Sequence, residues 1–465
     1  MQHTNQSSIS EYIVNAYLKR TPASRRIWEE ARKNLPAGSS RTSVFYPPYP
    51  SYASGALGDR ITDVDGNERI DYCFNFTSLI LGHRHPAVMK AVTDQLERGA
   101  AFGAPTELEL SHADKIRKRM PSAENVRFTV TGTEACMLAI RLARAYTDRT
   151  KIAKFEGGYH GSSDATSVSV HPDLNEIAGQ DFAPLPETAG LSPEVVANTV
   201  VLPFNDSDAV YSIIRRNREK LACIIVEPVM RGIPPAPGFL QSIRELASDS
   251  HIVLIFDEVI TGFRISPGGA QEKYHVRPDL TTMGKVIGGG FPIGAVGGSE
   301  DIMSLTAFEN IEFPSCKGPK VPHAGTFNAH PISLAAGIAT LKELNDANRD
   351  RLDKAGQSMR VGLKKALSEK RINAQVTGVG SLFDLHFAEH EITDYRTSLT
   401  ADHVLKRCLD LDLLNRGVFL PPIHFSCTSA ATTEDDINRT LENVSATLNL
   451  LLPLIKERRP RLLSR

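Results

Sequence analysis

The sequence predicts an α/β protein whose larger part is built on a mostly parallel sheet. Between about residue 80 and residue 341, short apolar runs alternate with segments that have the spacing of amphipathic helices. Two of the runs, Cys223–Val226 and Ile252–Phe256, are apolar on both faces, as expected of strands in a sheet that helices cover on both sides. After Leu341 the sequence becomes richer in helical segments, which predicts a smaller α+β domain at the C-terminus.

The composition is that of an ordinary globular protein. The chain has 465 residues, a length typical of two or three domains. Its 53 lysines and arginines balance 54 aspartates and glutamates, so there is no global field to hold a polyanion such as a nucleic acid. With 41% hydrophobic and 23% charged residues, the composition excludes a wholly disordered chain and a disulfide-rich miniprotein.

The cysteines and the N-terminus carry no signature of a metal site or of export. None of the six cysteines forms a Cys-x-x-Cys pair, so we predict no zinc finger, no redox dithiol and no metal site. The N-terminus lacks the basic start and apolar run of a signal peptide, and no apolar stretch approaches the ~18 residues that span a bilayer. We therefore expect a cytoplasmic protein without a membrane partner.

Residues 1–79 are expected to form an N-terminal segment with one helix and a β-hairpin. The helix is predicted around Arg25–Lys33 and is followed by turn-forming residues. Two short runs of strand-forming residues, Ile61–Val64 and Arg69–Tyr72, flank Asp65-Gly66-Asn67. Because glycine tolerates the positive φ of a tight turn, this pattern predicts a hairpin.

Residues 80–341 are expected to form the large domain. Its predicted strands are Val126–Thr131, Ile152–Phe155, Cys223–Val226 and Ile252–Phe256, and helices are predicted at Ala135–Ala145 and Pro237–Ser248. The first two strands each contain one basic residue, Arg127 and Lys154, so we expect these strands to lie nearer to an edge of the sheet.

Residues 342–465 are expected to form the small α+β domain. Its predicted helices are Arg349–Glu369, Asp402–Arg416 and Glu434–Leu452. A pair of strands is predicted around Gln375–Phe387 and Gly417–Pro421. The last helix follows two threonines and begins with three acidic residues. A hydroxyl cap and negative charge in the first turn both favour a helix start at this point.

Two carboxylates follow the most apolar strand. Asp257 and Glu258 come at the C-terminal end of Ile252–Phe256, where open α/β sheets bind ligands. Acidic residues also simply end strands, and a strand of this kind binds magnesium in P-loop ATPases. The ATPase is disfavoured because Gly284-Lys285 is followed by valine, so the phosphate-binding motif is absent. No Gly-x-Ser-x-Gly occurs either, which disfavours a serine hydrolase.

Lys285 lies between a strand-like run and three glycines, Gly288 to Gly290. A single lysine is more often a solvated surface residue than a catalytic one. Glycines, however, let the backbone approach a planar ligand closely, and a buried lysine with a lowered pKa is able to form a Schiff base.

Two further turns follow strands. Thr131-Gly132-Thr133-Glu134 joins a strand to a helix, so its free amides and hydroxyls are suited to hold a phosphate, although an ordinary helix cap explains it equally well. Gly157-Gly158-Tyr159-His160-Gly161 offers an aromatic face and an imidazole, for which a core tyrosine and a hydrogen-bonded histidine are the alternative interpretation. Pyridoxal phosphate is held by groups of these kinds: a lysine, an acid at the end of a buried strand, a phosphate-binding turn and an aromatic ring that stacks on the cofactor.

These motifs resemble those of the class III aminotransferases of fold type I, in the branch of glutamate-1-semialdehyde aminomutase and the β-amino-acid aminotransferases. The resemblance runs from about Leu35 to Leu450 and implies a seven-stranded, mostly parallel sheet between helices. The matching pieces include Asp63-Val-Asp-Gly-Asn, Leu81-Gly-His-Arg-His-Pro86, Thr131-Gly-Thr-Glu-Ala135, Phe155-Glu-Gly-Gly-Tyr-His-Gly161, Val226-Glu-Pro228, Phe256-Asp-Glu-Val259, Thr261-Gly-Phe-Arg264, Pro278-Asp-Leu-Thr-Thr-Met-Gly-Lys285 and Gly325-Thr-Phe327.

The resemblance implies the catalytic roles. Lys285 would form the covalent link to pyridoxal 5'-phosphate and then move a proton between the substrate and the cofactor. Asp257 would face the pyridine nitrogen and keep it protonated, so that the ring accepts the electron pair left when a C–H bond breaks.

The resemblance also implies the cofactor contacts. Gly132 and Thr133 match the phosphate-binding turn, Tyr159 the ring stacked on one face of the cofactor, and Val259 the aliphatic contact on the other face. Thr326 matches a phosphate ligand from the neighbouring subunit, which implies a homodimer.

Two residues are assigned to the substrate side. Glu227 matches a glutamate near the substrate and the 3'-oxygen of the cofactor. Arg41 matches an arginine that binds a substrate carboxylate, a task suited to a bidentate guanidinium, whereas a surface arginine is the alternative.

The expected reaction is a two-substrate transamination. The donor would carry a carboxylate, with a β-amino acid favoured, and the acceptor would be a 2-oxo acid, while pyridoxamine 5'-phosphate would form during turnover. The segments after Tyr-His-Gly and after Arg41 differ from those of the aminomutases, and so does 421–428. The alternatives are an intramolecular aminomutase, an amino-acid racemase or epimerase of the same family, and a cofactor-binding protein without turnover.

Overall fold

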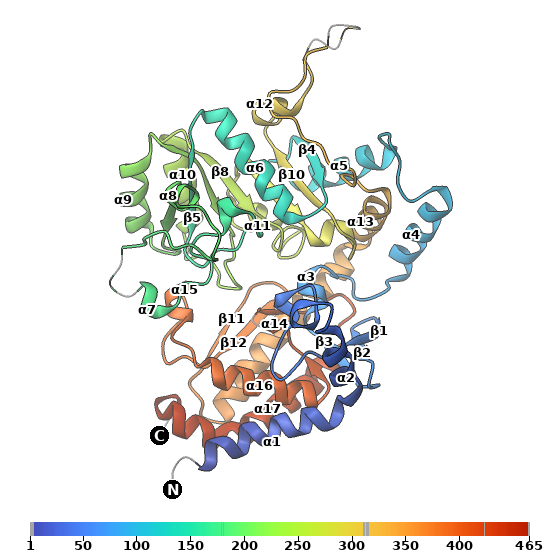
Figure 1. The fold of residues 1–465 in the computed structure, drawn as a ribbon, viewed down its shortest axis with the longest axis vertical. Helices are drawn as coiled ribbons and strands as arrows, with labels where there is room; N and C mark the ends of the chain where they lie inside the picture. The colour runs from blue at the N-terminus through green and yellow to red at the C-terminus, as the bar shows by residue number, and fades with distance from the viewer. Residues whose placement is uncertain are drawn as a thin grey trace. The chain divides into compact units, whose positions relative to one another are not determined.

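The computed structural model describes residues 4–177, 179, 181–309, 312, 316–422 and 424–463. It consists of two units (Figure 1). The central unit comprises 86–345 and 393–399, and the terminal unit comprises 1–85, 346–392 and 400–465. Within the described residues, no helix combines the length and the apolar character that crossing a membrane requires.

A seven-stranded sheet forms the centre of the central unit, in the order β4-β10-β9-β8-β7-β5-β6. The strands are β4 (Asn125–Thr129), β5 (Lys151–Phe155), β6 (Thr199–Leu202), β7 (Leu221–Val226), β8 (Val253–Asp257), β9 (Leu280–Gly284) and β10 (Gly294–Gly298). All neighbouring pairs are parallel except those of β10, which runs antiparallel to β4 and to β9. The predicted mostly parallel seven-stranded sheet is therefore confirmed.

Helices cover the sheet, which explains its apolar strands. Every residue of β7 and of β8 is buried. The helix α6 (Gly132–Thr147) buries Leu138 and Leu142 in one core with residues of the sheet. Elsewhere, three aromatic rings pack edge to face, among them Phe155 of β5 and Phe239 of α10 (Phe239–Asp249).

The other helices of the central unit precede, connect or follow the strands of the sheet. They are α4 (Pro86–Arg98), α5 (Glu107–Arg119), α7 (Leu174–Ile177), α8 (Pro193–Ala197), α9 (Ser207–Asn217), α11 (Gly269–Lys273), α12 (Glu300–Met303), α13 (Pro331–Glu343) and α15 (Tyr395–Ser398). The prediction that basic residues mark strands near an edge is confirmed: β4, with Arg127, is an edge strand, and β5, with Lys154, lies beside the edge strand β6.

The terminal unit contains two small sheets. One has the order β1-β2-β3-β13 and consists of β1 (Ala53–Leu57), β2 (Arg60–Asp63), β3 (Glu68–Asp71) and β13 (Val418–Phe419). The other has the order β11-β12-β14 and consists of β11 (Gln375–Thr377), β12 (Leu382–His386) and β14 (Ser426–Cys427). The expected pairing of 417–421 with 375–387 was therefore wrong, because β13 runs parallel to β3 and β14 takes the place beside β12.

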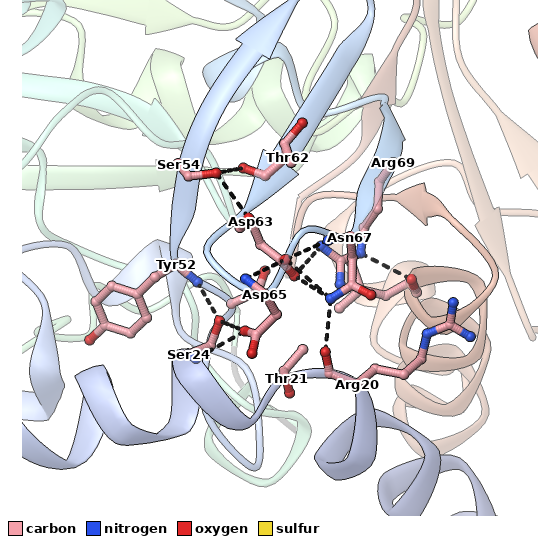
Figure 2. Close-up of polar contacts among 12 residues, drawn as sticks. Arg20, Thr21, Ser24, Tyr52, Ser54, Thr62, Asp63, Asp65, Asn67 and Arg69 are labelled. Carbon is pink, nitrogen blue, oxygen red and sulfur yellow. Dashed lines mark hydrogen bonds and ion pairs between the residues drawn. The ribbon is translucent and has the colours of Figure 1, made fainter.

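The hairpin predicted around Asp65-Gly66-Asn67 forms between β2 and β3 (Figure 2). Gly66 has φ 82°, and Oδ1 of Asp63 accepts hydrogen bonds from the amides of Asp65 (3.0 Å) and Asn67 (2.9 Å). The other oxygen of Asp63 pairs with the guanidinium of the buried Arg69 (2.7 Å). The turn is thus stabilised by a carboxylate as well as by the glycine.

In the described part of the chain, the terminal unit also contains the short α3 (Phe74–Thr77) and the longer helices α1 (Thr4–Arg20), α2 (Pro22–Ala31), α14 (Asp346–Glu369), α16 (His403–Asn415) and α17 (Glu434–Arg458). Thr433 caps α17 as predicted, since its hydroxyl accepts a hydrogen bond from the amide of Asp436. Sequence analysis missed α1, although Ile9, Ile13 and Tyr17 recur at helical spacing. Ile13 packs into the core that α14, α16 and α17 share.

The two ends of the chain belong to one unit. The expected N-terminal segment 1–79 includes β3, which pairs with β13 from the C-terminal part of the chain. In addition, 393–399 folds with the central unit although the residues before and after it belong to the terminal unit. Both features come from long-range pairings, which local sequence patterns do not reveal.

Candidate active site

Asp257 is the last residue of β8 and is held by a set of polar neighbours. Its side chain is buried, and Oδ2 lies 2.7 Å from Nδ1 of His160. The hydroxyl of Thr282 and the amide of Val259 donate to Oδ1 at 3.2 Å and 3.1 Å. The thiol of Cys136 lies 3.5 Å from Oδ2, and burial raises the pKa of this thiol well above its usual range. The carboxylate is therefore fixed in one orientation at the C-terminal edge of the sheet.

Lys285 lies close to Asp257 along the sheet. Asp257 pairs with Thr282 in the β8–β9 ladder, and Lys285 follows three residues later, directly after β9. Its backbone has φ 49°, an uncommon conformation for a residue with a side chain. The structure thus brings the lysine and the acid predicted from the sequence to the same end of two neighbouring strands.

The start of α6 faces these strands without side-chain bulk. Thr131 caps the helix by accepting a hydrogen bond from the amide of Glu134 (3.2 Å). A Cβ atom on Gly132 would lie 2.9 Å from Val259, and one on Gly284 would lie 3.7 Å from the Cα of Gly132. Glycine at Gly132 therefore lets Val259 and the strand end at Gly284 approach the start of α6 closely.

The turn after β5 carries Tyr159 and lies against the start of α6. A Cβ atom on Gly161 would collide with Thr133, so the two predicted turns are in contact. The amide of Tyr159 donates to Oε1 of Glu227 at 2.7 Å, and the tyrosine ring is 51% exposed. Burial raises the pKa of Glu227, as does the nearby charge of Asp257, while His160 lowers it.

The segment that follows Tyr159 is fixed by two cationic side chains. Nζ of Lys154, fully buried in β5, donates to the carbonyl of Val168 (2.6 Å). Arg231 donates from Nε to the carbonyl of Gly157 (2.6 Å) and from a terminal nitrogen to that of Val170 (2.8 Å). Burial lowers the pKa of Lys154 to about 7, and the charge of Arg231 contributes to that shift.

The helix α15 holds the same turn from another side. Arg396 forms a bidentate ion pair with the buried Glu156, with N–O distances of 2.6 Å and 3.0 Å. The ring of Tyr395 fills the space beside Gly157, where a Cβ atom would collide with it, and its hydroxyl donates to the carbonyl of Pro172 (3.0 Å). The residues that lead into Tyr159 are therefore held by a segment from beyond residue 390.

The remaining predicted residues are Thr326 and Arg41. Thr326 is exposed in a loop of the central unit. Arg41 belongs to the terminal unit, where one of its terminal nitrogens donates to Oδ1 of Asn75 at 3.0 Å.

Sequence reasoning missed several members of this arrangement. His160 was interpreted only as an imidazole near an aromatic residue, and Cys136, Thr282 and Arg396 were not considered. Cys136 and Thr282 carry a weak signal, since each lies three or four residues from a predicted site residue. Arg396 carries none, because its contact with Glu156 spans 240 positions of the chain.

These residues fit pyridoxal phosphate. A carboxylate suited to a protonated ring nitrogen lies at the strand ends with a lysine suited to an aldehyde. The start of α6 offers backbone amides and the hydroxyl of Thr133, which suit a phosphate. Nε2 of His160 is buried and has no hydrogen-bond partner among the described residues. The fold and this set of residues define an enzyme of fold type I that depends on pyridoxal 5'-phosphate.

Comparison with known proteins identifies the family. Residues 44–448 match the family model of the class-III aminotransferases, and the chain belongs to this family. It is 44% identical over 431 residues to a glutamate-1-semialdehyde 2,1-aminomutase from Methanothermobacter thermautotrophicus, a match that covers 92% of this chain and 99% of that protein.

Solved structures with a similar fold include enzymes of the same kind. An omega-transaminase from Sphaerobacter thermophilus is 42% identical, with a TM-score of 0.85 and coverage of 92% of this chain and 97% of that one. A glutamate-1-semialdehyde aminomutase variant from Pseudomonas aeruginosa PAO1, in complex with PMP, is 26% identical with a TM-score of 0.86, over 97% of this chain and 100% of that one.

Proposed function

We propose that the chain transfers an amino group with Lys285 and Asp257 as its catalytic residues. Pyridoxal phosphate, when bound, supplies an electron sink for the pair left by breaking a C–H bond next to the substrate nitrogen. Lys285 would hold the cofactor and move the proton of the substrate, while Asp257 would keep a proton at the ring nitrogen. The buried contact of Asp257 with His160 is the observation that carries this proposal, because it keeps the carboxylate oriented in a site of low dielectric.

The cofactor contacts are proposed from the same arrangement. Gly132 and Thr133, at the first turn of α6, bind the phosphate, while Tyr159 and Val259 contact the two faces of the ring. Glu227 supports the turn of Tyr159 through the hydrogen bond to its amide and lies on the substrate side.

The enzyme is proposed to act as a homodimer. Thr326 is exposed within its own chain, which suits a residue that completes the phosphate site of a neighbouring subunit. A molar mass of twice 50.9 kDa in light scattering supports this assembly, whereas a monomer that retains full activity contradicts it.

The first candidate reaction is the intramolecular one, a 2,1-aminomutase acting on glutamate-1-semialdehyde. Relatives of 40–44% identity, in matches that cover at least nine tenths of both chains, carry that name. In such a reaction the amino group returns to the same carbon skeleton, so no acceptor is needed. Arg41 binds the substrate carboxylate by a charge-assisted, bidentate pair.

The second candidate is the two-substrate transaminase that the sequence favours, with a β-amino acid as donor and a 2-oxo acid as acceptor. Two observations support it. The solved structure at 42% identity is an omega-transaminase, and Lys154, Arg231 and Tyr395 of α15 hold the segment after Tyr159 in place. An aminomutase retains its diamino intermediate under a gating loop, and a fixed segment at this position does not suit that task. No observation favours a racemase.

One experiment separates the two candidates. The purified holoenzyme is given glutamate-1-semialdehyde without an acceptor, and separately 3-amino-3-phenylpropanoate with pyruvate. Formation of 5-amino-4-oxopentanoate in the first assay supports the aminomutase. Formation of alanine in the second supports the transaminase. If the Lys285→Ala protein retains either activity, the catalytic assignment is wrong.

A further inference from the structure

The turn after β3 has an unusual backbone. Phe74, Asn75, Phe76 and Thr77 have positive φ values of 43°, 49°, 54° and 73° in succession, although none of them is glycine. Left-handed backbone is rare outside glycine, asparagine and aspartate, and it persists where the surrounding structure enforces it, commonly at functional sites. This left-handed turn therefore needs a functional explanation.

Contacts within the terminal unit enforce the conformation. Oδ1 of Asp71 accepts hydrogen bonds from the amides of Cys73 (2.7 Å) and Phe74 (3.0 Å). The side chain of Phe74 is fully buried, and the amide of Thr77 donates to the carbonyl of Cys73 at 2.9 Å. The backbone at Asn75 is thereby fixed, which gives its side chain a defined direction.

Both ends of the Asn75 amide are used. Its nitrogen donates to the hydroxyl of the buried Ser78 at 3.1 Å, and its oxygen accepts from a terminal nitrogen of Arg41 at 3.0 Å. Because a guanidinium only donates hydrogen bonds, the contact with Arg41 fixes which end of the amide faces it. One N–H of the guanidinium is thus occupied, and the edge formed by Nε and the other terminal nitrogen stays available for a carboxylate.

The other neighbours of the Arg41 guanidinium are also uncharged. Its central carbon lies 5.8 Å from the centre of the Phe76 ring, within the range of a cation–π contact. Among the described residues, no carboxylate forms an ion pair with Arg41. The turn therefore contacts the guanidinium through uncharged groups, an amide oxygen and an aromatic ring.

We propose that Asn75, held in the left-handed turn, is a positioning residue that directs Arg41 toward the substrate carboxylate. This inference rests on the proposed role of Arg41. An asparagine suits the position because it tolerates positive φ and offers a neutral oxygen. An aspartate would tolerate the same backbone, but its charge would pair with Arg41 and compete with the substrate.

The test compares Asn75→Gly, Asn75→Asp and Arg41→Ala in the holoenzyme. Each protein is assayed with glutamate-1-semialdehyde alone and with 3-amino-3-phenylpropanoate plus pyruvate, and the compound that the unchanged enzyme converts better serves as the reporter. The control amine is 1-phenylpropan-1-amine, which lacks a carboxylate. The melting temperature of each variant reports on folding.

Glycine accepts the left-handed backbone, so Asn75→Gly should keep the melting temperature and remove only the amide. We expect KM for the carboxylate reporter to rise about three- to tenfold, with a much smaller change in kcat. Asn75→Asp should raise KM further, because the introduced charge occupies the guanidinium. KM for the control amine should stay within about twofold in both variants.

Each failure has its own signature. If Arg41→Ala raises KM for the carboxylate reporter while both Asn75 variants leave it unchanged, the role of Asn75 is refuted and the proposed role of Arg41 stands. If the Asn75 variants lose activity equally toward the carboxylate reporter and the control amine, the positioning role of Asn75 is also refuted, since equal losses indicate a structural role. If Arg41→Ala changes nothing, or the unchanged enzyme converts neither reporter, the proposed function itself fails.

Discussion

His160 and Asp257 form a buried pair in which Nδ1 of the imidazole lies 2.7 Å from Oδ2 of the carboxylate. They come from different parts of the sheet: Asp257 ends β8, and His160 belongs to the turn after β5. The thiol of Cys136, the hydroxyl of Thr282 and the amide of Val259 also contact the carboxylate. The imidazole therefore restricts the direction in which Asp257 presents its second oxygen.

Replacing His160 should reduce catalysis more than folding. In His160→Leu the carboxylate of Asp257 loses a hydrogen bond to a buried neighbour, a loss of about 1.5–3 kcal/mol for a charged group. We expect kcat to fall by about ten- to a hundredfold, since about 1.4 kcal/mol corresponds to a factor of ten. His171→Leu is the matched control, because His171 also pairs with a carboxylate, Glu187, at 2.6 Å. Equal losses in both variants would argue against a specific role.

An alanine at Gly157 should destabilise the central unit. Gly157 has φ 80°, and a Cβ atom there would collide with the ring of Tyr395. We expect Gly157→Ala to cost about 2–4 kcal/mol of unfolding free energy, since overpacking adds to backbone strain. Gly190→Ala separates the two effects, because Gly190 has φ 101° and open space around it. Chemical denaturation of both variants gives the difference.

The pair of Arg396 and Glu156 should anchor α15. In Arg396→Met the buried carboxylate loses its bidentate partner, and we expect a loss of about 2 kcal/mol, below the 3–5 kcal/mol of a fully buried pair. The arginine side chain is 31% exposed, so water replaces part of the lost contact. Proteolysis near residue 396 should become faster. The control Arg461→Met alters a longer contact with Glu389 on an exposed arginine, at 3.9 Å, and should leave that rate unchanged.

Asp59 should make the stability of the terminal unit depend on pH. Burial raises its pKa from 3.8 to about 7, and the neighbouring Asp436 adds to this shift. Between these two values the folded chain holds more protons than the unfolded chain, so the unfolding free energy falls as the pH rises. Asp59→Asn should remove this decline.

Urea midpoints measured from about pH 4 to about pH 8 test the role of Asp59. Glu68→Gln is the control, because Glu68 also faces Arg60 (3.8 Å) but its side chain is 66% exposed. A decline with the same slope in Asp59→Asn and in the unchanged protein would assign the pH dependence to other groups.

Local patterns were sufficient to predict the parts of the site that strand ends define. Asp257 and Lys285 follow apolar runs, and parallel strands bring their carboxyl ends to one edge. The turn at Gly66 was predictable for a similar reason, because the hairpin is a local structure. The cofactor and the family came from the order of several motifs, none of which identifies the family alone.

Contacts between distant segments could not be predicted in this way. The pairing of β13 with β3 joins Val418 to Ile70. The ion pair between Arg396 and Glu156 joins α15 to the turn that follows β5. β10 was missed because the glycines in Gly294–Gly298 are poor strand formers, and antiparallel pairing on both sides compensates for them. Which strands pair over such distances depends on which surfaces remain to be covered in the folded protein, and the local patterns of a single sequence do not show this.

The placement of 393–399 constrains the order in which the protein is completed during synthesis. The fragment 86–345 leaves the ribosome without the residues that hold Glu156 and fill the space beside Gly157. The terminal unit is completed even later, because β3 is unable to pair with β13 until residue 419 has been synthesised. Neither unit is therefore able to finish folding before most of the chain exists, and an isolated 86–345 fragment would be an incomplete product rather than an independent domain.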